Sequence, residues 1–286
     1  MSGAPVREAL ESAVDALAAV GVEDPRLDAE LLLAEATGRS RAALVADPGA
    51  EVSPAAGRQF GEMVRRRLRR EPVAYILGRK GFRRLELAVD PRVLVPRPET
   101  ELLVELALEL RPARVLDVGT GSGAIALAVA DELPEAEVAA TDTSPGALEV
   151  ARANAQRLGL HERVRFLEGT LPDEGPFDLV LANLPYVAER DWPSLQPEVT
   201  KHEPREALLA GSDGLDAYRA LIPECSGHFN RYANEMTGAL AVEVGEGQAS
   251  AAAELMRAAG FGEVEVRADL AGIERVVLGH WVGVEA

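Results

Sequence analysis

Hydrophobic residues recur at helical spacing in the first quarter of the chain. The first series consists of Val6, Leu10, Val14, Leu17 and Val20. Steps of three and four residues predict one apolar face of an amphipathic helix. Two further helix starts are predicted where a proline follows a typical helix-capping residue, at Asp24-Pro25 and at Ser53-Pro54. We therefore predict a helical domain over residues 1–77.

Arginines cluster near the end of the third predicted helix. They are Arg65, Arg66, Arg67, Arg69 and Arg70. Cations at a helix C-terminus complement the helix dipole, so a solvated helix end is the expected arrangement. The alternative is a patch that docks an acidic partner.

The apolar pattern changes over residues 78–97, where apolar residues fall among glycines and prolines. This arrangement predicts short strands or a hairpin that links two domains. Pro98 then opens another helix, which runs through Leu110. For Arg97 and Glu99 two roles remain open: ordering the hairpin, or forming an ion pair without catalytic consequence.

Strands and helices alternate after Pro112. Strands are predicted at 114–118, 137–141, 164–167, 177–182, 240–244, 264–266 and 274–278, and helices at 122–133, 144–158 and 249–259. Such alternation favours an α/β domain with a largely parallel sheet, which we assign to residues 98–286.

Composition narrows the class of protein. A length of 286 residues suggests about two domains, and 47% hydrophobic with 27% charged residues is typical of an ordinary globular chain. The 30 basic and 47 acidic residues give a net charge of −17, which opposes nonspecific binding to a nucleic-acid backbone. Cys225 is the single cysteine, and the apolar runs are short, so we expect a cytoplasmic protein without a membrane span. The four scattered histidines show no metal-ligand spacing, and we predict no metal site.

A glycine-rich segment follows the first predicted strand of the α/β domain. Its residues are Gly119, Thr120, Gly121, Ser122 and Gly123. Glycines let the backbone turn sharply and let a ligand approach the N-terminus of the next helix. The spacing differs from the usual dinucleotide and P-loop patterns. A tight turn with nothing bound is the structural alternative.

Asp142 ends the next predicted strand, 19 residues after Gly123 (142 − 123). An interval of roughly 20 residues is typical of an acid that binds the ribose hydroxyls of a nucleoside. The alternative is a helix cap, a role that Ser144 can also fill.

A tetrapeptide, Asn183-Leu184-Pro185-Tyr186, follows the apolar strand at 177–182. Ligands of open α/β sheets bind beyond the carboxyl ends of the strands, so this tetrapeptide is expected to share a crevice with the glycine segment and Asp142. Its amide and carbonyl oxygens can accept hydrogen bonds from an –NH₂ group, and the tyrosine offers a flat surface. A turn with a core tyrosine is the alternative.

These motifs resemble those of S-adenosylmethionine-dependent amino methyltransferases of the Rossmann-like class I. More specific segments lie at 72–78, 95–101, 203–208, 214–219 and 243–248. Together they resemble the peptide chain release factor N5-glutamine methyltransferases, also called the HemK or PrmC family. The resemblance implies a Rossmann-like domain joined by a β-hairpin to a small helical domain that recognises the substrate.

The resemblance also implies a reaction and the residues that carry it. The reaction is methylation of the glutamine amide in the Gly-Gly-Gln motif of class I peptide chain release factors, with S-adenosylhomocysteine as product. The cofactor-binding residues implied are Gly119, Thr120, Gly121, Ser122, Gly123, Asp142, Leu171 and Asn183. The implied catalytic and substrate-binding residues are Asn183, Leu184, Pro185 and Tyr186. We expect a monomer and regard nucleic acid as an unlikely partner.

The sequence departs from the family pattern at two places. Leu184 stands where the family usually has proline, and Asn-Leu-Pro-Tyr also resembles the tetrapeptide of ribosomal RNA adenine dimethyltransferases. An adenine-N6 methyltransferase acting on RNA or DNA is therefore one alternative, and a non-catalytic cofactor-binding scaffold is another. The second departure, Cys225–Gly238, replaces a family turn rich in proline and glycine.

Overall fold

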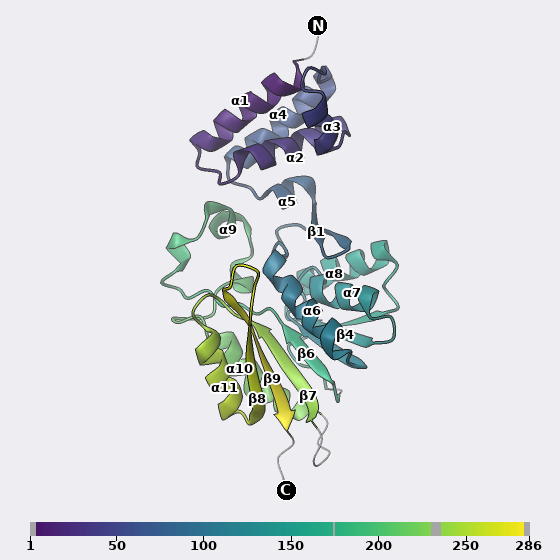
Figure 1. Ribbon diagram of the computed structural model, residues 1–286, viewed down its shortest axis with the longest axis vertical. Helices are drawn as coiled ribbons and strands as arrows, with labels where there is room; N and C mark the ends of the chain where they lie inside the picture. The colour runs from purple at the N-terminus through teal and green to yellow at the C-terminus, as the bar shows by residue number, and fades with distance from the viewer. Residues whose placement is uncertain (1–3, 174, 230–235, 283–286) are drawn as a thin grey trace. The chain divides into compact units, whose positions relative to one another are not determined.

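A computed structural model describes residues 4–173, 175–229 and 236–282, which form two compact units (Figure 1). The helical unit comprises the chain up to Arg79 together with Gln196–His202, and the sheet unit comprises Lys80–Leu195 and the chain from Glu203 onward. The division into residues 1–77, 78–97 and 98–286 did not place residues 196–202 with the helices. These seven residues join the helical unit through contacts with residues more than 100 positions away, which no local pattern reveals.

The helical unit packs its helices around one apolar core. Its helices are α1 (Val6–Ala19), α2 (Pro25–Thr37), α3 (Arg41–Ala46), α4 (Pro54–Leu68), α5 (Val73–Leu77) and α9 (Pro197–His202). The predicted stripe of α1 faces this core, where Val6, Leu10 and Leu17 are buried. The Ser53 hydroxyl accepts a hydrogen bond from the Ala56 amide at 3.2 Å and caps α4.

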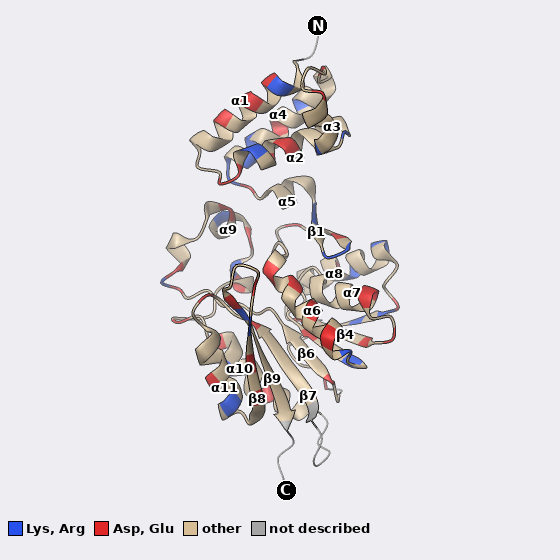
Figure 2. Ribbon diagram, viewed as in Figure 1, with Lys and Arg blue, Asp and Glu red and all other residues tan. Residues whose placement is uncertain are grey.

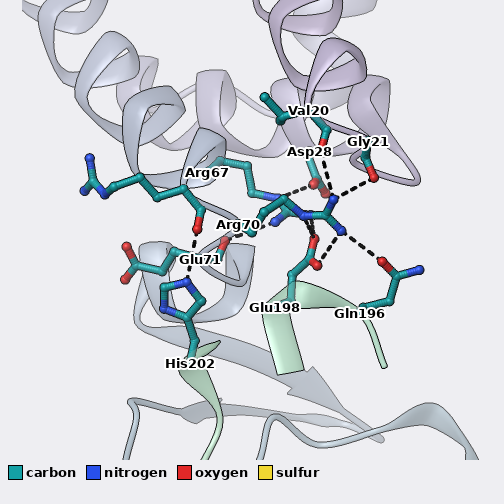
Figure 3. Close-up of polar contacts among 10 residues, drawn as sticks. Val20, Gly21, Asp28, Arg67, Arg70, Glu71, Gln196, Glu198 and His202 are labelled. Carbon is teal, nitrogen blue, oxygen red and sulfur yellow. Dashed lines mark hydrogen bonds and ion pairs between the residues drawn. The ribbon is translucent and has the colours of Figure 1, made fainter. Parts of the chain in front are cut away.

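Two of the clustered arginines are buried and hold α9 (Figure 3). Arg70 donates two hydrogen bonds to the Glu198 carboxylate, at 2.8 and 2.5 Å, and Arg67 lies 2.6 Å from the same group. Arg70 also donates to the carbonyls of Val20 and Gly21. The expectation of a solvated helix end is therefore wrong for Arg67 and Arg70. The acidic partner of these two side chains belongs to the same chain.

The sheet unit begins with a hairpin of β1 (Arg79–Phe82) and β2 (Leu85–Ala88). The buried side chain of Asn154, on α8 (Pro145–Leu158), accepts from the Ala88 amide at 2.7 Å and donates to the Ala88 carbonyl at 2.9 Å. This paired contact fixes the end of the hairpin against the α/β layers.

Seven strands of the described chain form one sheet in the order β5-β4-β3-β6-β7-β9-β8. The strands are β3 (Arg114–Val118), β4 (Glu137–Asp142), β5 (Val164–Glu168), β6 (Leu179–Ala182), β7 (Met236–Glu243), β8 (Phe261–Ala268) and β9 (Glu274–Val282). The first five strands in this order pair in parallel, and β9 pairs antiparallel with both β7 and β8. The predicted α/β sheet is confirmed.

Helices cover both faces of this sheet (Figure 1). One apolar cluster contains residues of α6 (Glu101–Leu110), α7 (Ala124–Glu132) and α8, and the other contains residues of α10 (Asp216–Cys225) and α11 (Ala249–Ala258). Neighbouring strand residues alternate between them, as Val115 faces the first cluster and Leu116 the second. None of the helices in the described residues is long and apolar enough to cross a membrane.

The unusual segment Cys225–Gly238 is described only in part, because residues 230–235 lie outside the described chain. Cys225 is buried at the end of α10, and the His228 carbonyl accepts from the Phe177 amide at 2.8 Å. The ring of Phe229 packs against those of Phe261 and Trp281, with centroid distances of 5.9 and 6.3 Å, and these two rings also contact each other at 5.4 Å. The start of the segment thus completes an aromatic cluster under the sheet.

Candidate active site

A pocket in the sheet unit lies at the carboxyl ends of the central parallel strands. It is lined by residues 119–122 after β3, 142–144 after β4, 169–170 after β5 and 183–185 after β6. Parallel strands bring these loops to one edge of the sheet, as the sequence analysis expects. Arg97 and Thr100, which precede α6, complete the wall beside the tetrapeptide.

The glycine segment turns at three residues with positive φ. The φ values are 75° at Gly119, 57° at Gly121 and 85° at Gly123. A Cβ at Gly123 would lie 2.9 Å from Leu127 Cδ1, so this glycine allows the helix to pack closely. A Cβ at Gly121 would meet no heavy atom within 4 Å and would enter open space instead. Gly123 therefore serves the turn, whereas Gly121 leaves room beside the pocket wall.

Asp142 joins the glycine segment to the start of α8. Its Oδ2 accepts from the Gly121 amide at 2.9 Å, and its Oδ1 accepts from the Ser144 amide at 2.8 Å. The Ser144 hydroxyl caps α8 by accepting from the Ala147 amide at 3.2 Å. A carboxylate oxygen can accept more than one hydrogen bond, so Asp142 retains the capacity to bind hydroxyl groups in the pocket.

The tetrapeptide presents three of its four residues to the pocket. Asn183, Leu184 and Pro185 line it, and the Asn183 Nδ2 donates to the Thr100 hydroxyl at 2.9 Å. Tyr186 is half-buried and is not among the lining residues. Its carbonyl accepts from Gln248 at 2.9 Å, and burial raises the pKa of its phenol to about 12. Tyr186 therefore stays protonated at neutral pH.

Two buried acids stand close to the pocket without forming its lining. Asp117 Oδ2 accepts from the Thr120 hydroxyl at 2.6 Å and from the Ala126 amide at 3.1 Å, and Glu243 is 2% exposed near the end of β7. Burial raises the pKa of each carboxyl to about 7. In the sequence, Asp117 and Glu243 are each an acidic residue within an otherwise apolar strand. This pattern marks them as unusual but does not indicate what they do.

Arg97 pairs with Glu203 and not with Glu99. The distance from Arg97 Nη2 to Glu203 Oε1 is 2.5 Å, and Glu203 also accepts from the Val95 amide at 3.3 Å. The Glu203 side chain is only 1% exposed. This pair fixes the segment before α6 against the loop whose residues Pro204, Glu206 and Ala207 line the pocket.

The cofactor contact expected at Leu171 lies beside the pocket and not in its lining. Leu171 packs against the core under the sheet, whereas Gly169 and Thr170 line the pocket. The Thr170 carbonyl accepts from the buried Thr141 hydroxyl at 2.7 Å, which turns this loop toward β4. The length of the loop after β5 cannot be read from a local pattern, so the sequence does not settle which of its residues faces the pocket.

Two protein-family models match the chain. The model described as "PrmC N-terminal domain" matches residues 8–78, and the model described as "Methyltransferase domain" matches residues 115–202. The first match falls within the helical unit. The second contains the glycine segment, Asp142 and the tetrapeptide.

Curated relatives match over almost the whole chain. A release factor glutamine methyltransferase of Geobacter sulfurreducens is 42% identical over 280 residues, which are 96% of each chain. Those of Caulobacter vibrioides and Moorella thermoacetica are 43% and 44% identical over at least 95% of each chain. The chain belongs to the release factor glutamine methyltransferase family. The suspected resemblance is thereby confirmed.

Solved structures of other methyltransferases resemble this family member in fold. A methyltransferase from Pyrococcus furiosus has a TM-score of 0.50 at 19% identity and covers 70% of this chain and 90% of its own. The hMettl16 catalytic domain in complex with MAT2A 3'UTR hairpin 6 has a TM-score of 0.55 at 15% identity, covering 70% and 76%. Both likenesses support the class I methyltransferase fold.

Proposed function

We propose that this protein transfers a methyl group from S-adenosylmethionine to the side-chain amide nitrogen of the glutamine in the Gly-Gly-Gln motif of class I peptide chain release factors. The observation that carries the proposal is that the glycine segment, Asp142 and Asn183–Pro185 line one pocket. The relatives that share most of the chain are named for the same reaction.

The residues of the pocket fit S-adenosylmethionine. Gly119, Thr120, Gly121 and Ser122 form a wall that is open at Gly121, and Asp142 offers carboxylate lone pairs to vicinal hydroxyls. Gly169 and Thr170 replace Leu171 as the proposed contacts after β5. When bound, the cofactor supplies a methyl group on a positively charged sulfur.

The tetrapeptide binds and orients the glutamine amide in this proposal. An amide nitrogen is a poor nucleophile because its lone pair is delocalised into the carbonyl group. Asn183 Oδ1 and the Leu184 carbonyl each accept one amide N–H, which aims the nitrogen and stabilises the positive charge that develops on it. The nitrogen gains the methyl group and releases a proton, and S-adenosylhomocysteine is the product.

Leu184 is compatible with this role because a backbone carbonyl is present at any residue. Its side chain also contributes to the pocket, since a Cβ at Gly119 would lie 3.2 Å from Leu184 Cδ2. Pro185 restrains the backbone that carries the Leu184 carbonyl, because proline limits the residue before it to extended conformations. Tyr186 packs behind the acceptor site and helps to exclude water.

The helical unit binds the body of the release factor in this account. A loop glutamine needs a second recognition surface on the enzyme, and residues 8–78 match a domain found in this family. The chain acts as a monomer in the cytoplasm. Acidic and basic residues are interspersed over the helices of this unit (Figure 2), which is compatible with a protein surface as partner.

An acceptor assay tests the proposal against its two rivals. A purified class I release factor and ribosomal RNA are incubated separately with the protein and S-adenosylmethionine, and methylation is followed by mass spectrometry. One added methyl group on the release factor supports the proposal. Methylation of RNA alone would favour the adenine methyltransferase, and binding of cofactor without any transfer would favour the scaffold.

A further inference from the structure

Arg92 and Arg97 both line the pocket, and they differ in how many of their side-chain nitrogens are bonded. Arg92 uses all three, because Nε and Nη2 donate to Asp90 and Nη1 donates to Glu149 at 2.8 Å. Among the described residues, the Arg97 side chain makes one hydrogen bond, from Nη2 to the Glu203 carboxylate at 2.5 Å. Arg97 is therefore the arginine of the pocket that keeps donors for another group.

Glu203 anchors Arg97 without using up its guanidinium group. The Glu203 side chain is 1% exposed, whereas that of Arg97 is 33% exposed. A guanidinium group offers two pairs of parallel N–H groups, and a single bond from Nη2 occupies only one of the pairs. The other pair of Arg97 remains accessible on a side chain that a core carboxylate holds in place.

Arg97 lies on the Asn183 side of the pocket. The Thr100 amide donates to the Arg97 carbonyl at 3.2 Å, and the Thr100 hydroxyl accepts from Asn183 Nδ2 at 2.9 Å. Asp142 ends β4, which is separated from β6 and Asn183 by β3 and the glycine segment. Arg97 and Asp142 therefore stand on opposite sides of the glycine segment.

We propose that Arg97 binds the methionyl carboxylate of S-adenosylmethionine. This inference rests on the proposed function, in which Asp142 binds the ribose and Asn183 lies where the methyl group is transferred. The sulfur joins the ribose to the methionyl group, so the methionyl group extends from the sulfur on the side away from Asp142. Its carboxylate is the one negatively charged group of the cofactor, and a planar pair of N–H groups matches two carboxylate oxygens.

Decarboxylated S-adenosylmethionine tests this role, because it differs from the cofactor in the carboxylate alone. Calorimetry without a release factor measures the Kd of both compounds. We expect the wild type to bind S-adenosylmethionine roughly 10- to 100-fold more tightly than the decarboxylated form. In Arg97→Gln, we expect the Kd for S-adenosylmethionine to rise roughly 10- to 100-fold and that for the decarboxylated form to change by less than about 3-fold. An unchanged ratio of the two Kd values would overturn the inference.

Arg97→Lys is the second variant, and it decides the question if Arg97→Gln leaves Glu203 unpaired and does not fold. Lysine keeps the positive charge but has no planar pair of N–H groups. We expect the preference for S-adenosylmethionine over the decarboxylated form to be roughly 3-fold weaker than in the wild type. A preference equal to that of the wild type would contradict binding through the planar group.

Arg84→Gln is the matched control for the change in charge. Arg84 also belongs to the sheet unit, but its side chain is 74% exposed and lies 3.7 Å from the carboxylate of Glu132. We expect the Kd values of both compounds to stay within about 2-fold of the wild-type values.

A carboxylate of the protein that accepts the methyl group is the other group of this chemistry that Arg97 could bind. In that case Arg97→Gln would raise the KM for the release factor and leave the ratio of the two Kd values unchanged, which would overturn the inference. A wild type that binds the cofactor but methylates no release factor would overturn the proposed function instead. The two Kd values would still decide the role of Arg97.

Discussion

The buried charge that holds α9 in the helical unit is paired differently from two buried acids near the pocket of the sheet unit. In the helical unit, the Glu198 carboxylate contacts the guanidinium groups of both Arg67 and Arg70. Arg70 also donates to two backbone carbonyls and to the Gln196 side chain (Figure 3). In the sheet unit, Asp117 and Glu243 each keep one oxygen without a partner among the described residues. The ion pairs of Glu198 connect segments that are distant in the sequence, whereas Asp117 and Glu243 lie near the pocket with one oxygen each unpaired.

The pKa of Glu198 shifts in the opposite direction from the pKa values of Asp117 and Glu243. Burial by itself would raise the pKa of Glu198, but Arg70 and Arg67 outweigh it and keep the pKa below its ordinary value. Burial raises the pKa of Asp28, which shares Arg67 with Glu198. For Asp117 and Glu243 in the sheet unit burial dominates, and their pKa values rise to about 7.

The largest expected effect comes from breaking the paired cluster. Arg70→Ala removes the bidentate partner of Glu198 and is expected to destabilise the helical unit by about 3–5 kcal/mol, because an incompletely paired charge remains buried. Urea unfolding followed by hydrogen exchange in residues 4–79 measures this loss.

Arg65→Ala is the matched control for Arg70. Arg65 pairs with Glu62 on the surface of α4, where both side chains are 62% exposed, so the expected loss is below about 1 kcal/mol. Equal losses in the two variants would refute the distinction between paired core charge and surface charge.

Asn183→Ala tests the catalytic end of the sheet unit. The variant lacks the amide oxygen that binds the glutamine, and kcat is expected to fall roughly 100- to 1,000-fold. The affinity for S-adenosylmethionine, measured by calorimetry, is expected to fall much less. Wild-type turnover would remove Asn183 from the mechanism.

Asp142→Asn tests the cofactor side of the pocket. The asparagine –NH₂ group would face the backbone N–H of Gly121 or of Ser144, which is also a donor. The variant would also lack the negative charge proposed to bind the ribose hydroxyls. We expect the Kd for S-adenosylmethionine to rise roughly 10- to 100-fold. Asp131→Asn, at an exposed position of α7, is the control that is expected to bind normally.

The segments that line the pocket and are continuous in the chain could be predicted from the sequence. Gly119–Ser122, Asp142 and Asn183–Pro185 each lie at or directly after the end of a strand, so their spacing carries the signal. The hydrogen bond between Asn183 and Thr100 spans 83 positions, and that between Arg70 and Glu198 spans 128. Such contacts depend on tertiary packing, and no local pattern contains them.

The last prediction concerns the pH dependence of stability. The pKa of Glu243 rises from an ordinary 4.5 to about 7 on folding, so the folded state binds the proton more tightly. The free energy of unfolding is therefore highest below about pH 4.5, where Glu243 is protonated in both states. It decreases as the pH rises toward about 7. Glu243→Gln removes the titrating group. We therefore expect the melting temperature of the variant, relative to that of the wild type, to increase as the pH rises from about 4.5 to about 7.

Glu246→Gln controls for the change in net charge. Glu246 is exposed, and a surface substitution of this kind is expected to leave the melting temperature close to that of the wild type at each pH. A constant difference between Glu243→Gln and wild type across the pH range would contradict the role of burial at Glu243.

Tandem mass spectrometry of the methylated release factor tests the central claim most directly. The wild-type protein, S-adenosylmethionine and a class I release factor are incubated, and the peptide that carries the Gly-Gly-Gln motif is fragmented. The account predicts one methyl group on the side-chain nitrogen of that glutamine, and none after incubation with Asn183→Ala. A methyl group on another residue, or equal methylation by both proteins, would contradict it.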